Sequence, residues 1–502
     1  MADPRGQVRP QGLKGIPAQG SQERNNKSWK ELVEMSKNVK FGKDCFTNCE
    51  GVLPTAWKDG LISPIFKKGN KTDPSNYRPI SLTCLSSKIM EHIIYSNTMS
   101  HLKAHGIITP DQHGFQRGLS CETQLISAIH DWGKVVDTHG QSDIIFLDFA
   151  KAFDSVPHER LLSKLKYYGV TGSLNNWLRA FLTGRRQAVV VNGSSSNWST
   201  VLSGVPQGTV LGPLLFILYI NDIGSGICSS MKLFADDSII YRPITCPEDH
   251  TILQQDIYNL TIWATNWQMN FEPSKCYALS ITLKKNPSTF HYYMHETSLA
   301  LVTCQKYLGV YITSNLSWSH HFHEVIKKAN RVLGLLQRNL SSCSPTVKER
   351  AYKALVRPIP EYGSTAWSPH TAKDNNGLES IQRRAARFVC KDYQRTSSVT
   401  NMINSLGWDS LEKRRVLADV TMLYKIHGGL VDVPFPSEMT PSDQRTRSAN
   451  LVNFRHLQST VNAYRHSFFV RTIPIWNCLP VSVVTSSDTK IFKVSAMSVI
   501  AV

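Results

Sequence analysis

Three aspartates stand out in this 502-residue sequence because each interrupts an apolar segment. Asp148 directly follows the apolar residues 144–147, and Asp236 and Asp237 form a pair inside MKLFADDSIIY. Carboxylates brought together repel one another and lose hydration, and a divalent cation relieves that cost. Two Mg²⁺ ions about 3.5–4 Å apart can hold the attacking and leaving oxygens of a phosphoryl transfer. We therefore predict that the three aspartates are catalytic and bind two Mg²⁺ ions, with Mn²⁺ as an alternative.

The expected elements explain how these aspartates could meet. Residues 144–147 are typical of a short buried strand, and residues 231–241 of a strand, a tight turn and a second strand. Adjacent side chains on a strand point to opposite faces, but a turn can direct both toward one site. Pairs of aspartates are also common in exposed turns and helix caps. The apolar residues on both sides of Asp236 and Asp237, together with Asp148, favour the catalytic interpretation.

Two further segments could bind a nucleotide. In residues 203–223 glycines recur every four residues around Gln207 and Gly208, which lets a backbone approach a flat ligand closely. The alternative is a buried turn that packs a helix, and spacing alone favours that alternative. The second segment, IFKKGNKTDPSNYRPI, places Lys67, Lys68 and Arg78 around a polar loop, where they could hold a triphosphate or merely be solvated.

Charge points to a polyanionic partner. Lys and Arg number 56 against 38 Asp and Glu, a formal net charge of +18. Residues 320–395 alone hold 14 Lys and Arg against 6 Asp and Glu, on two expected amphipathic helices at 321–339 and 378–390. Nucleic acid is the leading partner, an anionic membrane surface the weaker one, and solvated helices the alternative. The basic residues we expect to contact nucleic acid are Lys327, Lys328, Arg331, Arg383 and Arg384.

Several classes of protein are disfavoured. No run reaches the 18 apolar residues that a membrane span needs, and the polar N-terminus has no apolar core of a secretory signal. The eleven cysteines are scattered and complete no zinc pattern. We therefore expect an intracellular protein of the nucleus or cytoplasm. Strands and helices alternate without regular βαβ units, which predicts an α+β fold, with a helix at 86–103, an amphipathic helix at 251–270 and a strand at 307–312.

Taken together, the motifs resemble one family, the reverse transcriptases of non-LTR (LINE-type) retrotransposons. The resemblance runs from about residue 57 to 312. Its motifs, in order, are PIFKKG, NYRPISL, HGFQRGLS, FLDFAKAFDSVPH, SGVPQGTVLGPLLFILYINDI, FADDSIIY and KYLGVYI. Two later segments, RPIPEYGSTAW and IPIWNCLP, are similar to the thumb and C-terminal parts of the family.

The resemblance implies a right-hand polymerase of fingers, palm and thumb, and a role for each matching residue. Asp148 and Asp236 correspond to the metal-binding aspartates of the palm, with Asp237 completing the pair. Phe153 corresponds to the bulky residue that excludes a ribose 2′-OH. The implied nucleotide-binding residues are Lys67, Arg78, Gln207 and Gly208, with Lys275 as a looser match.

The expected organisation follows. Residues 1–50 are polar and predicted to be mostly disordered, residues 57–312 form the fingers and palm, residues 313–400 a helical thumb, and residues 401–502 a C-terminal region without an assigned role. The expected activity is DNA synthesis at a DNA 3′ end on an RNA template from dNTPs. The alternatives are a catalytically inactive RNA- or DNA-binding relic and an RNA-directed RNA polymerase, against which Phe153 argues. The sequence shows no endonuclease before the polymerase motifs, so autonomous transposition is not expected of this chain.

Overall fold

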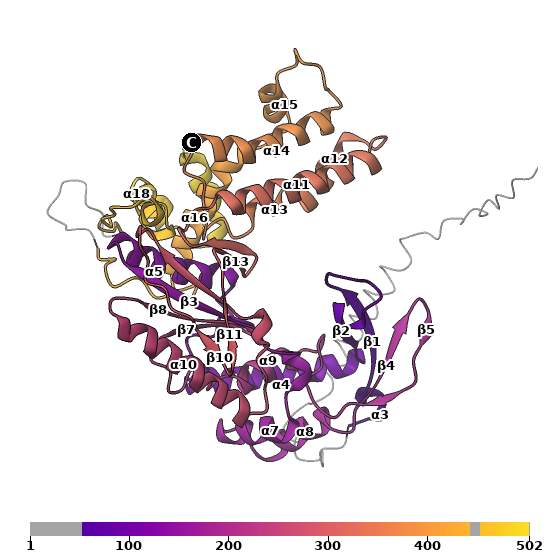
Figure 1. The fold of residues 1–502 in the computed structure, drawn as a ribbon. Helices are drawn as coiled ribbons and strands as arrows, with labels where there is room; N and C mark the ends of the chain where they lie inside the picture. The colour runs from indigo at the N-terminus through magenta and orange to yellow at the C-terminus, as the bar shows by residue number, and fades with distance from the viewer. Residues whose placement is uncertain (1–52, 442–451, 501–502) are drawn as a thin grey trace, which may run out of the picture.

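The computed structural model describes residues 53–441 and 452–500. The predicted disorder of residues 1–50 lies outside the described residues. In Figure 1 the two larger sheets lie among helices in the middle and lower parts of the molecule, and the helices of the C-terminal part of the chain lie above them. Within the described residues no helix combines the length and apolarity needed to cross a membrane. Strands and helices are mixed without βαβ repetition, so the α+β prediction is confirmed.

The central sheet positions two of the three aspartates: Asp148 follows one strand directly, and Asp237 begins the neighbouring strand. Its order is β12 (Ala300–Leu301), β9 (Tyr277–Thr282), β3 (Gln141–Leu147), β8 (Asp237–Pro243) and β7 (Ser230–Phe234). All its pairs are antiparallel except β12–β9. Every residue of β3 is buried. The predicted strand at 144–147 is therefore confirmed, and it begins three residues earlier.

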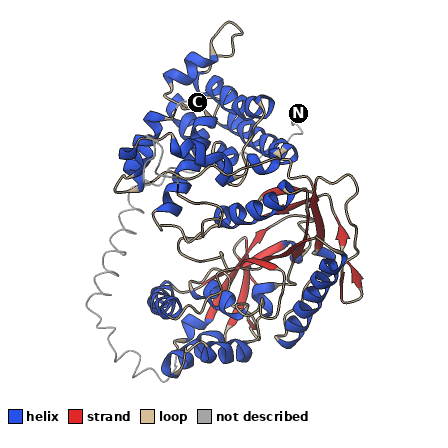
Figure 2. Cartoon of the chain, turned by 90° about the vertical axis from the view of Figure 1, so that its left-hand side faces the viewer, coloured by secondary structure: helices blue, strands red, loops and turns tan. Residues whose placement is uncertain are grey.

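Alternate residues of β3 enter two different cores, as the two-residue repeat of a strand requires. Ile145 and Leu147 pack into a core with helices α4 (Leu85–Ala104), α7 (His158–Tyr167), α8 (Gly172–Leu182), α9 (Leu211–Tyr219) and α10 (Pro247–Asn266). Ile144 and Phe146 pack into a second core with α5 (Cys121–Asp137) and the helices beyond residue 318. Figure 2 shows helices on both sides of the strands. The strand that leads to Asp148 is thus fixed from both faces.

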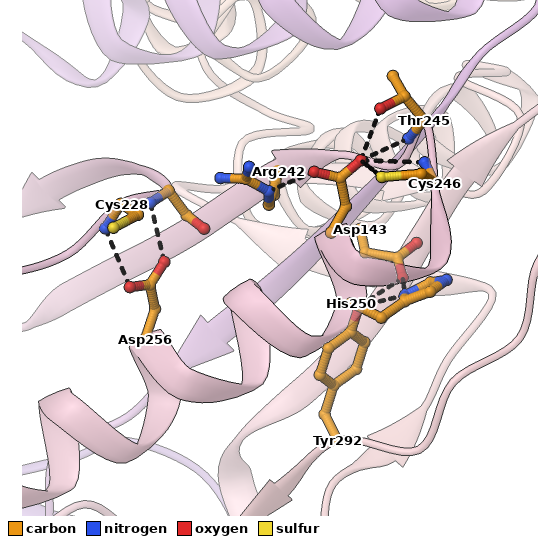
Figure 3. A network of polar contacts seen from close by, with 10 residues as sticks. Asp143, Cys228, Arg242, Thr245, Cys246, His250, Asp256 and Tyr292 are labelled. Carbon is orange, nitrogen blue, oxygen red and sulfur yellow. Dashed lines mark hydrogen bonds and ion pairs between the residues drawn. The ribbon is translucent and has the colours of Figure 1, made fainter.

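A polar network secures the end of β3 opposite Asp148 (Figure 3). The Tyr292 hydroxyl donates to Asp143 Oδ2 at 2.7 Å, and His250 Nδ1 lies 3.2 Å from the same oxygen. His250 belongs to α10, so the network attaches that helix to the central sheet. At the start of α10, Asp249 accepts hydrogen bonds from the backbone N–H groups of Thr245 and Cys246 and caps the helix. Burying Asp143 in this way holds the strand in one register.

A peripheral sheet lies beside the central one. It contains β1 (Asp59–Phe66), β2 (Tyr77–Leu82), β4 (Arg186–Val191), β5 (Ser194–Ser195) and β6 (Ser199–Thr200), in the order β2-β1-β4-β5 with β6 also on β4. At Asn192 and Gly193 the chain turns back on β4, and the return strand is split into the two short pieces β5 and β6. The remaining short elements of this part of the chain are α3 (Thr55–Lys58), η1 (Pro74–Asn76), α6 (Ala152–Ser155), η2 (Pro273–Lys275) and the separate two-stranded sheet of β10 (Tyr293–Met294) and β11 (Thr297–Ser298).

The strand predicted at 307–312 is wrong, because the chain reverses inside it. Strand β13 (Cys304–Tyr307) pairs antiparallel with β14 (Val310–Thr313), and the turn consists of Leu308 and Gly309. Both turn residues have positive φ, +44° and +87°. Glycine tolerates a positive φ, so Gly309 indicated a turn. The apolar residues on both sides of it suggested an uninterrupted strand instead.

The chain beyond β14 is mainly helical, as predicted. The two basic helices are longer than expected at their starts: α11 spans Ser319–Asn339 and α14 spans Ala372–Cys390. Between and after them lie α12 (Pro345–Ala351), the π-helical segment η3 (Tyr352–Val356), α13 (Pro358–Glu361) and α15 (Val399–Ser405). Five more are called here the C-terminal helices: α16 (Leu411–His427), α17 (Asn462–Arg465), α18 (Phe468–Asn477), α19 (Val481–Val484) and α20 (Thr489–Val499). All but α17, which packs on α5, share a third core.

Candidate active site

The strand pairing brings the three aspartates together. Leu147 of β3 pairs with Ser238 of β8, which places Asp148, the next residue, alongside Asp237. On the other side Phe234 pairs with Asp237, so β7 and β8 are joined by a two-residue turn of Ala235 and Asp236. The predicted strand, turn and strand are confirmed, with Asp236 in the turn and Asp237 as the first residue of β8.

A glutamine that the sequence did not single out holds this turn. Ala235 has φ +54°, a region that a residue with a side chain rarely adopts. Gln112 Oε1 accepts the N–H of Ala235 at 3.0 Å and the N–H of Gly114 at 2.7 Å, and the Gln112 side chain is buried. The N–H of His113 donates to the Leu233 carbonyl, and the N–H of Leu233 donates to the Asp111 carbonyl, which joins this segment to β7. The only sequence signal was that Gln112 immediately precedes the motif HGFQRGLS.

The three carboxylates repel one another in the folded chain. Burial raises the pKa of Asp237 to about 6, and the charges of Asp236 and Asp148 contribute to that rise. Burial likewise raises the pKa of Asp148 and of Asp236. Asp148 is nevertheless only half-buried, and Asp236 and Asp237 are exposed, so solvent reaches all three residues. Such a cluster favours a cation.

Lysine and cysteine side chains border Asp148. Lys275 Nζ lies 3.9 Å from Asp148 Oδ2 and lowers the pKa of that carboxyl against the larger effect of burial. The backbone N–H of Asp148 donates to the buried Cys276 Sγ at 3.4 Å. Lys275, the loosest match among the predicted residues, therefore does lie at the aspartate cluster. Cys276 was not predicted, although it follows Lys275 directly.

The loop that contains Gln207 and Gly208 is attached to the peripheral sheet and to α6. The N–H of Ser81 in β2 donates to the Gln207 carbonyl at 2.7 Å, and Gln207 Nε2 donates to Asp154 Oδ1 at 3.1 Å. A side chain at Gly208, which has φ +98°, would place its Cβ 2.9 Å from the Ser81 carbonyl oxygen. Glycine is thus required for close packing against β2. The packing turn that the spacing favoured is therefore present, and the place of this loop beside a nucleotide stays a prediction.

Phe153 lies partly buried beside this loop. Its ring stacks on Phe216 of α9, with centroids 4.3 Å apart and planes at 18°. Its carbonyl accepts the N–H of Val205 at 2.8 Å. The ring therefore has a structural role in packing, and the residue is only partly buried.

Two predicted cations from the peripheral sheet reach toward the cluster. Arg78 in β2 lowers the pKa of Asp236 and of Asp237, and Lys67, just after β1, lowers the pKa of Asp148 and of Asp236, in each case against the raising effect of burial. Both side chains are exposed. The structure therefore gathers Lys67 and Arg78 near the same three carboxylates.

The basic residues of the second half share an exposed surface. Helices α11 and α14 pack together, and Arg384 donates to Asn330 Oδ1 at 2.9 Å across their contact. The five predicted nucleic-acid-binding residues are all exposed: Lys327, Lys328, Arg331, Arg383 and Arg384. One of them, Lys327, is paired within its helix, 3.7 Å from Glu324.

The donor set fits a hard divalent cation, although nowhere in residues 53–441 and 452–500 do three His, Cys, Asp or Glu side chains already enclose an ion site. Mg²⁺ needs only one or two protein carboxylates when substrate phosphates supply other ligands. Asp148, Asp236 and Asp237 offer oxygen ligands only, and each carries a raised pKa that a cation would reverse. The residues that would hold the metal are these three.

Comparison with known proteins assigns the fold and site to a family. Residues 65–312 match the family described as "Reverse transcriptase (RNA-dependent DNA polymerase)". This stretch contains the three aspartates, Lys275 and the loop at 203–208. The polymerase region of the chain therefore belongs to the reverse transcriptase family.

Within that family, the chain is similar to polymerases of non-LTR retrotransposons. It is 30% identical over 365 residues to the "Probable RNA-directed DNA polymerase from transposon X-element" of Drosophila melanogaster, covering 69% of this chain and 39% of that protein. For the corresponding protein from transposon BS, identity is 30% over 376 residues, which are 70% and 40% of the two chains. The chain thus spans about two fifths of the length of these relatives.

A distant likeness also exists among solved structures. Apo telomerase from Candida Tropicalis aligns with 80% of this chain and 73% of its own, at a TM-score of 0.40 and 12% sequence identity. The RNA-dependent RNA polymerase of a human picorbirnavirus gives a TM-score of 0.38 at 10% identity. At these scores the shared geometry is partial.

Proposed function

We propose that the chain is an RNA-directed DNA polymerase that extends a DNA 3′ end on an RNA template, using dNTPs. The observation that carries the proposal is the aspartate cluster, in which Asp237 has a pKa of about 6 because burial and two neighbouring carboxylates disfavour its charge. The family of residues 65–312 supports the same activity. The relevant RNA and DNA are intracellular, and we place the protein in the nucleus or cytoplasm on that ground.

In this proposal each residue has a stated role. Asp148, Asp236 and Asp237 would hold two Mg²⁺ ions, which supply charge stabilisation for the attacking 3′ oxygen and the leaving pyrophosphate. Lys67 and Arg78 neutralise the triphosphate from the peripheral sheet, and Lys275 adds a positive charge beside Asp148. Residues 57–312, which include the peripheral sheet, then form the fingers and palm, and residues 313–400, which include α11–α14, form the thumb.

The base and sugar of the nucleotide are selected by the other side of the site. Gln207 and Gly208 present backbone against which a flat base can lie. The exposed part of Phe153 faces the sugar and leaves a 2′-OH without space or a hydrogen-bond partner. The exposed basic faces of α11 and α14 contact the phosphates of the template–primer duplex, through Lys327, Lys328, Arg331, Arg383 and Arg384.

A primer-extension assay tests the proposal against both alternatives. Wild-type chain with an RNA template and a DNA primer should incorporate dNTPs, and incorporation from NTPs should be far slower. An RNA-directed RNA polymerase would prefer NTPs, and an inactive relic would bind the duplex without extending it. Absence of dNTP incorporation in the presence of Mg²⁺ or Mn²⁺, with duplex binding intact, overturns the proposal.

The matched variant is Asp236→Ala. Loss of this carboxylate should reduce incorporation to background, because no other side chain of the cluster can replace the missing ligand. Duplex binding should persist, since the basic helices are remote in sequence and are unchanged. Measured incorporation above background in this variant contradicts the metal assignment.

A further inference from the structure

The C-terminal helices contact the rest of the molecule at several places, and two of these bear on the site. The first is α5, a helix that packs on the central sheet. Asp137 at the end of α5 accepts the N–H groups of Thr460 and Val461 at 2.7 and 2.9 Å. Ile126 of α5 also belongs to the core of the C-terminal helices, and His130 packs its ring on Phe469. Figure 1 shows α16 and α18 lying directly above α5.

The second place is residues 362–367, which we call the junction loop because α13 ends just before it and α14 begins soon after. Arg471 of α18 donates to the backbone carbonyl oxygens of Ser364 and Thr365 at 3.0 and 2.8 Å. The same guanidinium makes a two-pronged ion pair with Asp419 of α16, at 2.9 and 3.0 Å. Both side chains are largely buried, with 11% and 3% exposed. Planar guanidinium geometry suits this set of acceptors, and a lysine could not reach them all.

The junction loop in turn fixes the turn of the β13–β14 hairpin. The Tyr362 hydroxyl donates to the Leu308 carbonyl at 2.9 Å. A Cβ at Gly309 would lie 2.8 Å from the Tyr362 ring, so the ring and the turn are in close contact. Trp367, at the other end of the loop, donates to the Tyr362 carbonyl at 3.0 Å and packs on Phe322 of α11. One loop therefore connects the hairpin turn to the first basic helix.

This hairpin packs on the strand that leads to the catalytic cluster. The ring of Tyr307 in β13 packs on that of Phe146, two residues before Asp148, with centroids 5.7 Å apart. Gln124 Nε2 of α5 donates to the buried Tyr307 hydroxyl. The Asp237 carboxylate also raises the pKa of Tyr307 beyond the effect of burial. Contacts thus run from Arg471 through the junction loop to the turn of this hairpin and to α11.

We propose that the C-terminal helices are a brace, in which Arg471 is a positioning residue that holds the junction loop, and through it the β13–β14 turn and α11, against the primer. The inference rests on the proposed polymerase function and assigns a role to the region beyond residue 400. The brace sets how long the enzyme stays on the primer end. It makes no contact with the incoming nucleotide.

The test uses the full chain with Arg471→Met, which keeps the length of the side chain and removes every hydrogen bond. Arg465→Met is the matched control, because Arg465 is an exposed arginine of the neighbouring helix α17. Tyr362→Phe removes only the hydroxyl that binds Leu308. Dissociation from an RNA–DNA template–primer is measured with a heparin trap, dNTP KM and the single-nucleotide rate are measured separately, and hydrogen exchange is followed in residues 304–313.

Arg471→Met and Tyr362→Phe should each leave the primer roughly tenfold faster, the size of effect expected for one charged or buried hydrogen bond, with dNTP KM unchanged. Exchange in residues 304–313 should be faster in both and unchanged in Arg465→Met. The proposal is overturned if Arg471→Met leaves the primer and exchanges its amide hydrogens as slowly as the wild type. If Arg471→Met does not fold, the same result for Tyr362→Phe overturns the proposal. Failure of the wild type to extend any primer overturns the polymerase function instead, and the exchange comparison still tests the brace.

Discussion

Replacing Asp237 by Asn should make the metal-free protein more stable at neutral pH. The pKa of this carboxyl is about 6 in the folded chain against an ordinary value of 3.8. A shift of about two units corresponds to at most about 3 kcal/mol, and because the side chain reaches solvent, screening reduces the expected gain to about 1 kcal/mol. For a chain of this length that corresponds to a rise in Tm of about 1–2 °C.

The sign of the pH dependence follows from which state binds the proton more tightly. The folded chain does, so protonation of Asp237 stabilises it fully below about pH 4, and this contribution is lost as the pH rises through about 6. Asparagine carries no charge at any pH. The gap in stability between Asp237→Asn and the wild type should therefore be largest at pH 7.5 and shrink by roughly half at pH 5.

Thermal unfolding in EDTA at the two pH values measures this gap. Asp59→Asn serves as a control of opposite sign, because a hydrogen bond from Arg186 lowers the pKa of Asp59 and its loss should not stabilise the chain. Adding Mg²⁺ should stabilise the wild type more than Asp237→Asn. The reasoning is refuted if Asp237→Asn is no more stable than the wild type at pH 7.5, or if the gap does not change with pH.

Three other outcomes test the remaining parts of the site. Phe153→Val should raise rNTP use relative to dNTP use by about tenfold, and an unchanged ratio in single-nucleotide kinetics would leave Phe153 as packing against Phe216 alone. Gln112→Ala should slow incorporation without weakening duplex binding, because the turn at Ala235 loses the hydrogen bond from its N–H to Gln112. Equal incorporation rates in the variant and the wild type would show that the turn forms without Gln112. Neutralising Lys327, Lys328, Arg383 and Arg384 should lower the log–log salt slope of duplex binding by roughly 0.7–0.9 per lost phosphate contact, and an identical slope would mean that these side chains are only solvated.

The catalytic cluster could be predicted because its signal is local. Each aspartate lies at the end of an apolar strand, and the strands need only pair in antiparallel fashion for Asp148 and Asp237 to meet. Gln112 could not be predicted in the same way. It lies more than 120 residues from the turn that it supports, and nothing in its residue type or its neighbours distinguishes it from other polar residues of the sequence.

The errors have physical causes as well. The apolar run through 307–312 looks like one strand because Leu308 is apolar, yet its backbone adopts a positive φ that the sequence alone does not show. For the C-terminal helices, amphipathic spacing indicates that an apolar face exists but not what covers it. The contact of Arg471 with the carbonyl oxygens of Ser364 and Thr365 leaves no trace in the side chains at those positions.

The hydrogen bond between the Ser81 N–H and the Gln207 carbonyl has a mechanical consequence. Any rotation of the peripheral sheet relative to the central sheet must either break this bond or carry residues 203–208 along. Carrying the loop along would in turn break the bonds that join Gly204, Val205 and Gln207 to Val156, Phe153 and Asp154, in the segment that follows Asp148. The peripheral sheet, with Lys67 and Arg78, is therefore tied through this loop to the segment beside the aspartates, and moving one away from the other breaks hydrogen bonds at one end of the loop.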